Sequence, residues 1–291
     1  MFTGAMTMRR SRVLDKWAQD EPCLGVAVHS TDASVYELVS LMGFDLIWMD
    51  LEHHAHSVQT AESLMRAARL GVSDIMARPA KGEFMRLGRL LEAGANGIMY
   101  PRCDDEAEAE HVVRWSKFAP LGERGLGGGG PDMPYGSMPV DRYVQEANAN
   151  TFIAIQLESP AAVDRAEAIA TVTGVNLLFF GPGDYSVLTG VPGQVRHAKV
   201  DRAVARVAEA AAATGQRWGT VSFSPEHSQM LLEMGASMIV PANDMDMLAQ
   251  GLRQLQSTYA GLSFRFESRL CEPVVDRSAR DRPSTAVTSY A

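Results

Sequence analysis

The chain has few cysteines and no long apolar run. Its 291 residues include three cysteines, Cys23, Cys103 and Cys271, which lie far apart. This spacing gives neither a disulfide framework nor a Cys-x-x-Cys zinc motif, so we expect a reducing, cytoplasmic environment. Apolar stretches such as residues 175–180 fall far short of the roughly 20 residues of a membrane-spanning helix. We therefore predict no contact with a membrane.

Positive charge is also scarce. Lys and Arg together number 27 against 35 for Asp and Glu, a formal net charge of −8, and no run of basic residues occurs. The chain therefore lacks the attraction to phosphate that nucleic-acid binding needs, and we predict no nucleic-acid partner. Hydrophobic residues make up 46% of the chain, which is typical of a folded globular protein rather than a disordered one.

A regular alternation of short apolar runs and amphipathic stretches fills residues 24–256. The predicted strands are Leu24–Val28, Asp45–Asp50, Asp74–Arg78, Gly97–Pro101, Phe152–Leu157, Leu177–Gly181, Arg217–Ser222 and Ser237–Pro241. The predicted helices cover 33–42, 57–70, 82–93, 104–118, 159–171, 199–214, 225–234 and 244–256. Eight such units predict an α/β fold, the (β/α)8 TIM barrel. The alternative is an open, doubly wound sheet.

The domain organisation follows from this alternation. We expect an N-terminal segment with a short helix over 1–23, a catalytic barrel over 24–258 and a poorly ordered C-terminal tail over 259–291. A Gly- and Pro-rich connection, Ala119–Asn150, interrupts the alternation. Connections of this length are usually functional or disordered.

The polar residues at the predicted strand ends are the candidate active site, because barrel enzymes work at that end. Glu158 and Asp184 follow neighbouring strands. Two carboxylates with open positions suit Mg²⁺, Mn²⁺ or a similar ion, although both residues could instead cap helices or form ion pairs. Arg78 is a candidate carboxylate clamp because of its planar fork, or else a structural salt bridge. Trp48 is either a core side chain or a stacking surface for substrate.

Histidines cluster after the second predicted strand. His53 is a candidate general base, which Asp50 could orient, or else an ordinary loop residue. His53, His54 and His56 invite a zinc interpretation, but the helical spacing and the accompanying cysteine that would favour it are missing.

Gly125–Gly130 formally matches the dinucleotide pattern Gly-x-Gly-x-x-Gly. It follows a loop rather than a strand and precedes prolines rather than a helix, so the match is weak. We predict a flexible active-site loop and no nucleotide cofactor.

Several motifs together resemble the HpcH/HpaI aldolases, which are metal-dependent class II pyruvate aldolases. The matching segments are Phe44–His53, Arg78-Pro79, Ala119–Gly125, Gln156–Ser159 and Gly181–Ser186, in the family's order. The resemblance implies a (β/α)8 barrel that needs Mg, Mn or Co. It also implies a lyase that reversibly cleaves a 4-hydroxy-2-oxo acid, through a metal-bound enolate, into pyruvate or a close 2-oxo acid and an aldehyde.

The resemblance also assigns roles to residues. Glu158 and Asp184 become the metal ligands, His53 the catalytic base and Arg78 the group that holds the pyruvyl unit and its enolate. Asp50 accompanies the base. The implied substrate contacts are Trp48, Arg78, Gln156, Gly183, Asp184, Tyr185 and Ser186. Glu92 stands where the family often has an Asp that pairs with the catalytic His, and it becomes a supporting residue.

The residues leave alternative reactions open. No lysine follows a predicted strand, which disfavours a Schiff-base aldolase. Trp48, Asp50 and His53 are also similar to the arrangement in macrophomate synthase, so oxaloacetate decarboxylation with trapping of the enolate is an alternative. A non-catalytic barrel that only binds a 2-oxo acid is a third. The resemblance implies a homo-oligomer, a trimer or hexamer, in which the last helix is exchanged between neighbours.

Overall fold

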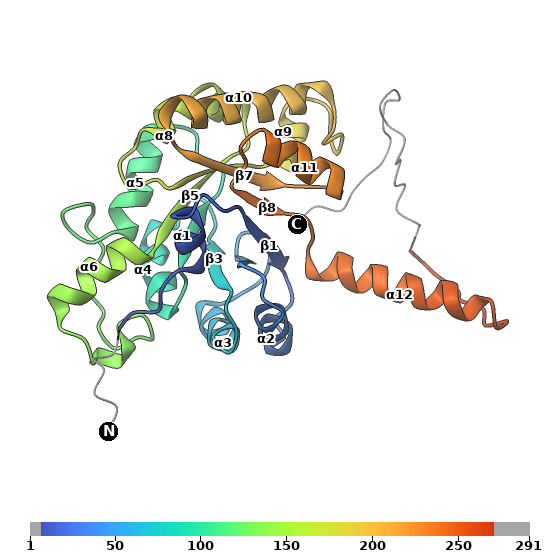
Figure 1. Ribbon diagram of the computed structural model, residues 1–291, viewed down its shortest axis with the longest axis horizontal. Helices are drawn as coiled ribbons and strands as arrows, with labels where there is room; N and C mark the ends of the chain where they lie inside the picture. Colours follow the sequence, from blue (N-terminus) through green and yellow to red (C-terminus); the bar gives the residue numbers. More distant parts are fainter. Residues whose placement is uncertain (1–6, 271–291) are drawn as a thin grey trace.

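Within residues 7–270, which the computed structural model describes, the strands close into a parallel barrel (Figure 1). The strands are β1 (Cys23–Val28), β2 (Leu46–Asp50), β3 (Asp74–Arg78), β4 (Gly97–Tyr100), β5 (Phe152–Leu157), β6 (Leu177–Phe180), β7 (Arg217–Val221) and β8 (Met238–Val240). Each pairs with the next along the chain, and β8 returns to β1. The predicted (β/α)8 barrel is therefore confirmed, and the open sheet is excluded.

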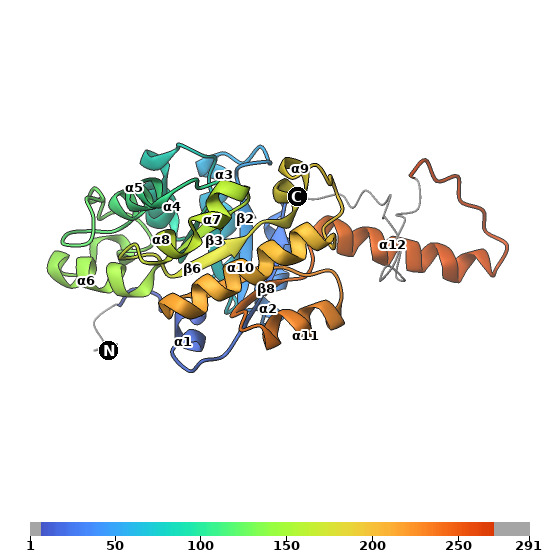
Figure 2. The ribbon, with the colours of Figure 1, turned by 90° about the horizontal axis from the view of Figure 1, so that it is seen from above.

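Helices surround this barrel (Figure 2). They are α1 (Arg12–Trp17), α2 (Ala33–Leu41), α3 (Val58–Ala68), α4 (Phe84–Ala93), α5 (Glu106–Ser116), α6 (Val140–Asn150), α7 (Pro160–Asp164), α8 (Ala166–Ala170), α9 (Pro182–Leu188), α10 (Ala198–Thr214), α11 (Pro225–Glu233) and α12 (Asp244–Ala260). Side-chain caps begin many of them. The Ser57 hydroxyl accepts from the backbone N–H of Thr60 at α3, and Ser224 accepts from that of His227 at α11.

The structure corrects three details of the predicted helices. The connection Ala119–Asn150 is not wholly irregular, because residues 140–150 form α6 and bury Tyr143 and Ala147. The single helix predicted over 159–171 is two short helices that meet at Arg165. Helix α9, absent from the prediction, begins directly after β6 with Pro182 at its first turn. Its Gly-Pro-Gly start looked like a loop in the sequence.

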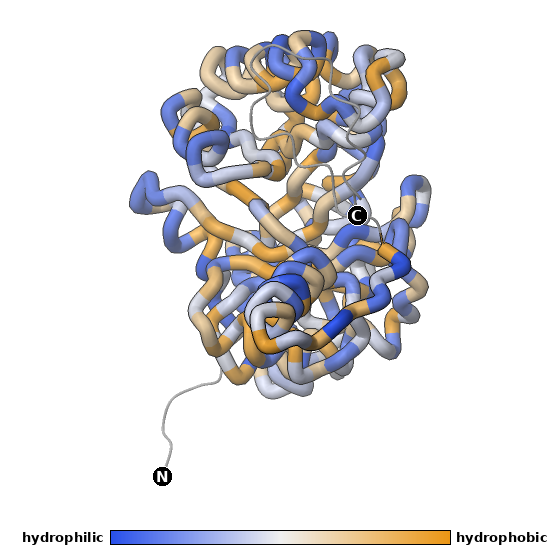
Figure 3. Tube along the Cα trace, turned by 90° about the vertical axis from the view of Figure 1, so that its right-hand side faces the viewer, coloured by the Kyte–Doolittle hydropathy of each residue, from blue (hydrophilic) through white to orange (hydrophobic). Residues whose placement is uncertain are grey.

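Two apolar layers account for the barrel. Side chains alternate along each strand, so one set fills the barrel and the other faces the helices. The interior set includes Trp48, Met76 and Phe179, whereas Ile47 and Met49 belong to the layer beneath the helices. Figure 3 colours the chain trace by hydropathy and shows hydrophobic segments running through the middle of the molecule. This alternation also turns Asp50 to the same side as Trp48.

The N-terminal segment closes the end of the barrel where the strands begin. The Ser11 hydroxyl and the Val13 backbone N–H both donate to the Asp74 carboxylate, at 2.6 and 2.9 Å. Trp17 Nε1 donates to the carbonyl of Ser237, just before β8. Substrate must therefore enter at the opposite end, where the strands finish.

Helix α12 leaves the barrel and extends outward (Figures 1 and 2). Asp244 is its only buried residue. Residues 261–270 form neither helix nor strand, and residues 271–291 of the predicted C-terminal tail lie outside the described residues. Among residues 7–270, we find no helix with the length and apolar character required to span a bilayer.

Candidate functional site

Asp50 and Arg78 form the centre of the site at the carboxyl ends of β2 and β3. They are paired in register across the two strands. Arg78 Nε donates to Asp50 Oδ1 at 2.9 Å, and Arg78 Nη2 lies 2.8 Å from Oδ2. Burial alone would raise the pKa of Asp50, but the hydrogen bond and charge of Arg78 outweigh it and hold that pKa below its usual value.

An aromatic ring and an amide group also hold Arg78 in place. Its guanidinium lies 4.5 Å from the centre of the Trp48 ring, a cation–π distance. Its Nη1 donates to Gln156 Oε1 at 3.4 Å. Only 2% of the side chain is exposed. A buried guanidinium fixed in this way can present its charge to an anion without rearranging.

Gln156 links Arg78 to the first predicted metal ligand. Its Nε2 donates to Glu158 Oε1 at 2.6 Å, and the backbone N–H of Arg102 donates to Oε2 at 3.1 Å. A Cβ on Gly181 would lie 2.4 Å from Glu158 Oε1, so a glycine there admits the carboxylate. Burial, reinforced by the charges of Asp184 and Glu52, raises the Glu158 pKa to about 8.

Asp184 and Glu52 complete an oxygen-rich group with Glu158. Burial and the neighbouring charges of Asp50 and Asp184 also raise the pKa of Glu52. Among the described residues, the Asp184 carboxylate makes no hydrogen bond or ion pair. Mutually repelling carboxylate oxygens with free lone pairs are the ligands that a hard divalent cation prefers, so Glu158 and Asp184 fit such an ion. The sequence prediction missed Glu52, which was visible only as the residue before His53.

His53 lies at the edge of the site, and its side chain is 45% exposed. Its Nε2 is 3.7 Å from Glu52 Oε2, and its backbone N–H donates to Asp50 Oδ1 at 3.4 Å. The next residue is closer to the core: His54 Nε2 lies 3.7 Å from Asp50 Oδ2. The ring of His54 also packs, tilted by 35°, against His29, which follows β1 and which the sequence prediction missed.

The remaining predicted substrate contacts lie on α9. The Ser186 hydroxyl donates to the carbonyl of Gly183 at 2.6 Å and accepts from the N–H of Gly193 at 3.0 Å. The Tyr185 ring packs on Phe180 beneath the helices. The Ser186 and Tyr185 side chains therefore contact residues of α9 and its neighbours. The predicted substrate contacts of Gly183, Tyr185 and Ser186 stay predictions.

The glycine-rich segment lies away from this site. It follows the carboxyl end of α5 and packs against the carboxyl end of α4, where a Cβ on Gly130 would lie 2.7 Å from the Glu92 carbonyl oxygen. Helices of a (β/α)8 barrel end where the strands begin. The prediction of an active-site loop at Gly125–Gly130 is therefore wrong within this chain. The error arose because the glycine pattern does not show at which end of the barrel the segment lies.

Glu92 belongs to the same end of the barrel. A Cβ on Gly127 would lie 2.5 Å from Glu92 Oε1. Burial raises the pKa of Glu92, and the charge of Asp132 reinforces this while Arg124 opposes it. Within one chain, Glu92 therefore faces Arg124 and Asp132 rather than His53. The pairing that the family resemblance implied is not made inside a single chain.

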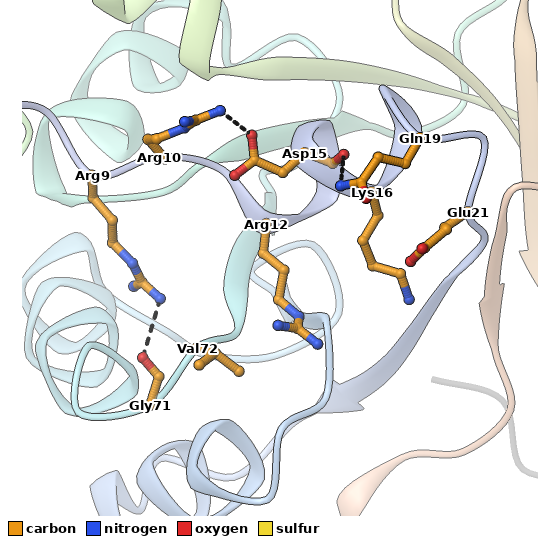
Figure 4. Close-up of a pocket in the computed structure, with 9 residues that line it drawn as sticks. All are labelled: Arg9, Arg10, Arg12, Asp15, Lys16, Gln19, Glu21, Gly71 and Val72. Atoms are coloured by element: carbon orange, nitrogen blue, oxygen red, sulfur yellow. Dashed lines mark hydrogen bonds and ion pairs between the residues drawn. The ribbon is translucent and has the colours of Figure 1, made fainter.

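A separate cavity of about 550 Å³ lies beside α1 (Figure 4). Its cations already have partners: Arg10 lies 2.6 Å from Asp15, and Arg12 and Lys16 lie 2.6 and 2.8 Å from Asp45. Each of these cations is already paired with a carboxylate, so the cavity carries no evident anion site.

A closed parallel barrel with an arginine and converging carboxylates at the carboxyl ends of its strands defines an enzyme of the (β/α)8 class. Residues 24–250 match the family model of HpcH/HpaI aldolase/citrate lyase. The chain belongs to the HpcH/HpaI aldolase/citrate lyase family. It is a carbon–carbon lyase of that family.

Known proteins agree with this assignment. The 2-keto-3-deoxy-L-rhamnonate aldolase of Klebsiella pneumoniae is 28% identical over 232 residues, 80% of this chain and 86% of that protein. The crystal structure of a family member from Burkholderia cenocepacia is 31% identical, with a TM-score of 0.78, covering 83% of this chain and 95% of that one. Macrophomate synthase, 24% identical with a TM-score of 0.76 over 89% of this chain and 93% of that one, shows the same fold.

Proposed function

We propose that the chain is a divalent-metal-dependent aldolase. It reversibly cleaves a 4-hydroxy-2-oxo acid into pyruvate, or a close 2-oxo acid, and an aldehyde. The observation that carries this proposal is the linked series Asp50–Arg78–Gln156–Glu158, with Asp184 beside it. Similarity to the Klebsiella aldolase supports the same reaction class.

Glu158 and Asp184 would hold the metal ion, Mg²⁺, Mn²⁺ or Co²⁺. Such an ion, when bound, would polarise the 2-oxo group and help to stabilise the negative charge of an enolate. Arg78 presents a second positive charge to the same oxygen, from a guanidinium that Asp50 and Trp48 fix in place. A preorganised charge of this kind stabilises the transition state without reorganising during the reaction.

His53 would take the proton from the 4-hydroxyl, directly or through a water molecule. Its exposed position gives it access to the part of the substrate that becomes the aldehyde. Loss of this proton forms the aldehyde C=O bond as the C3–C4 bond breaks, and the electron pair passes to the 2-oxo oxygen. The enolate then takes up a proton at C3 from solvent and leaves as pyruvate. In the reverse direction, His53 returns the proton to the new hydroxyl group.

The lysines support a mechanism without a Schiff base. The chain has four, and each amine is engaged: Lys16 with Asp45, Lys81 with Asp104, Lys117 with Thr151 and Lys199 with the Thr189 carbonyl. None is placed at the centre of the site to attack a carbonyl.

Helix α12 supports a homo-oligomer, which we propose to be a trimer or hexamer. Leu248, Leu252, Leu255 and Tyr259 are 46–56% exposed on it, and their spacing places them on one helix face. A helix that extends from its own barrel with an apolar face is suited to packing against a neighbouring subunit. Exchange of this helix between subunits would cover that face.

We also propose a cytoplasmic location. The described cysteines, Cys23 and Cys103, are buried free thiols rather than a disulfide. Free thiols are typical of a reducing compartment.

The proposal is tested by incubating the enzyme with pyruvate, Mg²⁺, Mn²⁺ or Co²⁺, and a panel of aldehydes, followed by identification of the products. We expect 4-hydroxy-2-oxo acids from the wild type and none from Glu158→Gln or Asp184→Asn. Products that form equally well after chelation, or in both variants, would contradict the metal assignment.

Oxaloacetate decarboxylation remains a second candidate. The similarity of Trp48, Asp50 and His53 to the arrangement in macrophomate synthase, whose fold this chain shares, favours it. Oxaloacetate turnover no faster than with the metal ion alone would exclude this reaction. A barrel that only binds 2-oxo acids, the third possibility, would not exchange the methyl protons of pyruvate with solvent.

A further inference from the structure

Two histidines and one carboxylate meet beside the proposed reaction centre. His29 follows β1, and His54 follows β2; their ring centres are 4.1 Å apart. Asp50 Oδ2 lies 3.7 Å from His54 Nε2. One ligand atom from each of His29, His54 and Asp50 lies within 4.8 Å of the other two. These distances bring two nitrogen donors and one oxygen donor around a single point.

The donor atoms are buried and lack hydrogen bonds. Among the described residues, neither His29 Nε2 nor His54 Nε2 nor Asp50 Oδ2 makes one. Asp50 Oδ2 has an ion-pair contact with Arg78 Nη2 at 2.8 Å. Buried polar atoms without a hydrogen-bond partner are uncommon and require an explanation. A bound ion would satisfy both imidazole nitrogens at once and would share the Asp50 carboxylate with Arg78.

Carboxylates lie close to both histidines. Asp50 is near His54, and Asp244 Oδ1 lies 3.8 Å from Nδ1 of His29, whereas the nearby charge of Arg78 is already paired with Asp50. Backbone N–H groups of His29 and Ser30 hold the Asp244 carboxylate at 3.0 and 2.9 Å. A carboxylate behind a ligand histidine orients the ring and fixes its tautomer. Burial opposes protonation of both imidazoles, since it lowers the pKa of His29 to about 4 and also lowers that of His54.

We propose that His29, His54 and Asp50 form a second metal site, distinct from the carboxylate pair Glu158 and Asp184. Two imidazoles and one carboxylate prefer a borderline transition ion such as Zn²⁺ or Co²⁺ over Mg²⁺. The site needs no aldolase activity and does not rest on the proposed function.

The second ion would also affect Arg78. Asp50 Oδ1 would keep its 2.9 Å hydrogen bond to Arg78 Nε, while Oδ2 would exchange its contact with Nη2 for the ion. The guanidinium would then be held by one bond to Asp50 instead of two. With an ion at the second site, Arg78, the residue proposed to stabilise the enolate, would therefore be held less firmly.

The site is tested with Co²⁺ alone, using the full chain after chelator treatment. The background variant is Glu158→Gln with Asp184→Asn, which removes the carboxylate site. We expect this variant to bind about one equivalent of Co²⁺, with visible absorption bands that Zn²⁺ abolishes. Adding His54→Ala, a substitution in a partly exposed loop, should reduce the binding to near zero, and adding His29→Ala should do the same.

Control variants show whether the loss of Co²⁺ binding is specific to the proposed ligands. His53→Ala and the surface variant His111→Ala should each keep the equivalent of Co²⁺ in the same background. Asp244→Asn should weaken Co²⁺ binding by about 10- to 100-fold, as expected for a carboxylate behind a ligand. Circular dichroism confirms folding of each variant. A background variant that binds no Co²⁺, or a folded His54→Ala variant that binds it unchanged, would overturn the proposal.

Discussion

Asp50 holds Arg78 through both carboxylate oxygens, at 2.9 and 2.8 Å, and both side chains are buried. The pair connects the ends of β2 and β3 and sets the direction of the guanidinium. Removing one partner of a buried ion pair leaves the other charge unpaired, which is costly. The same contact therefore stabilises the fold and organises the site.

Asp50→Asn should lower the free energy of unfolding by about 3 kcal/mol, because it removes the carboxylate charge that makes the two closest contacts to the buried Arg78 and leaves only the ion pair with Glu52 at 3.3 Å. Urea denaturation measures this change. The control is Glu62→Gln, which breaks the surface pair between Glu62 and Arg66 and should cost less than about 1 kcal/mol. Equal stability of the two variants would show that the buried pair contributes little.

Asp74 predicts a pH dependence of stability. Burial raises its pKa from 3.8 to about 6, so the folded state keeps this proton to a higher pH than the unfolded state. The contribution of protonated Asp74 to folding stability is complete below the pKa that Asp74 has in the unfolded chain. It is lost as the pH rises through about 6. Asp74→Asn cannot titrate at this position. Its free energy of unfolding should therefore rise relative to that of the wild type, by up to about 3 kcal/mol, between pH 4 and pH 7. A difference in unfolding free energy that is constant with pH would refute this assignment.

His53→Ala should separate the two candidate reactions. Aldol cleavage needs a base for the 4-hydroxyl, so its kcat/KM should fall by about 10²- to 10⁴-fold. Oxaloacetate decarboxylation loses CO₂ and removes no hydroxyl proton, so any such activity should change much less. Steady-state kinetics with both substrates test this difference, and equal losses would remove His53 from the role of hydroxyl base.

The apolar face of α12 predicts an assembly that charges on that face should disrupt. Light scattering of the wild type should give three or six times the 31.6 kDa of one chain. Leu252→Glu with Leu255→Glu should shift the protein to smaller species, because the charges would be buried at the interface. The control, Gln250→Glu with Ser257→Glu, places the same charges on the opposite helix face and should keep the assembly. A monomeric wild type would contradict the proposed oligomer.

The sequence predicts the barrel well because each strand is a short apolar run whose polar ending is easy to locate. Asp50, Arg78 and Glu158 were identified in this way, and their side chains are linked in the structure through Gln156. Helix α6 was missed because Gly and Pro before it suggested a loop over the whole connection.

Other features depend on contacts between distant segments. His29 reaches His54 only because β1 and β2 are neighbours. The position of Glu92 beside the glycine-rich segment follows from where α4 ends. Neither the His29–His54 contact nor the position of Glu92 can be read from a short stretch of sequence, because both arise when the barrel closes.

The central claim, that this chain forms the enolate of pyruvate with a metal ion at Glu158 and Asp184, is tested most directly by proton exchange. Pyruvate in D₂O is followed by NMR with the enzyme and Mg²⁺, Mn²⁺ or Co²⁺. We predict loss of the methyl proton signal with the wild type, no enzyme-dependent loss after chelation or with Glu158→Gln, and exchange about 100-fold slower with Arg78→Lys. The account would be contradicted by exchange that persists unchanged without metal and in Glu158→Gln, or by no exchange with any of the three ions.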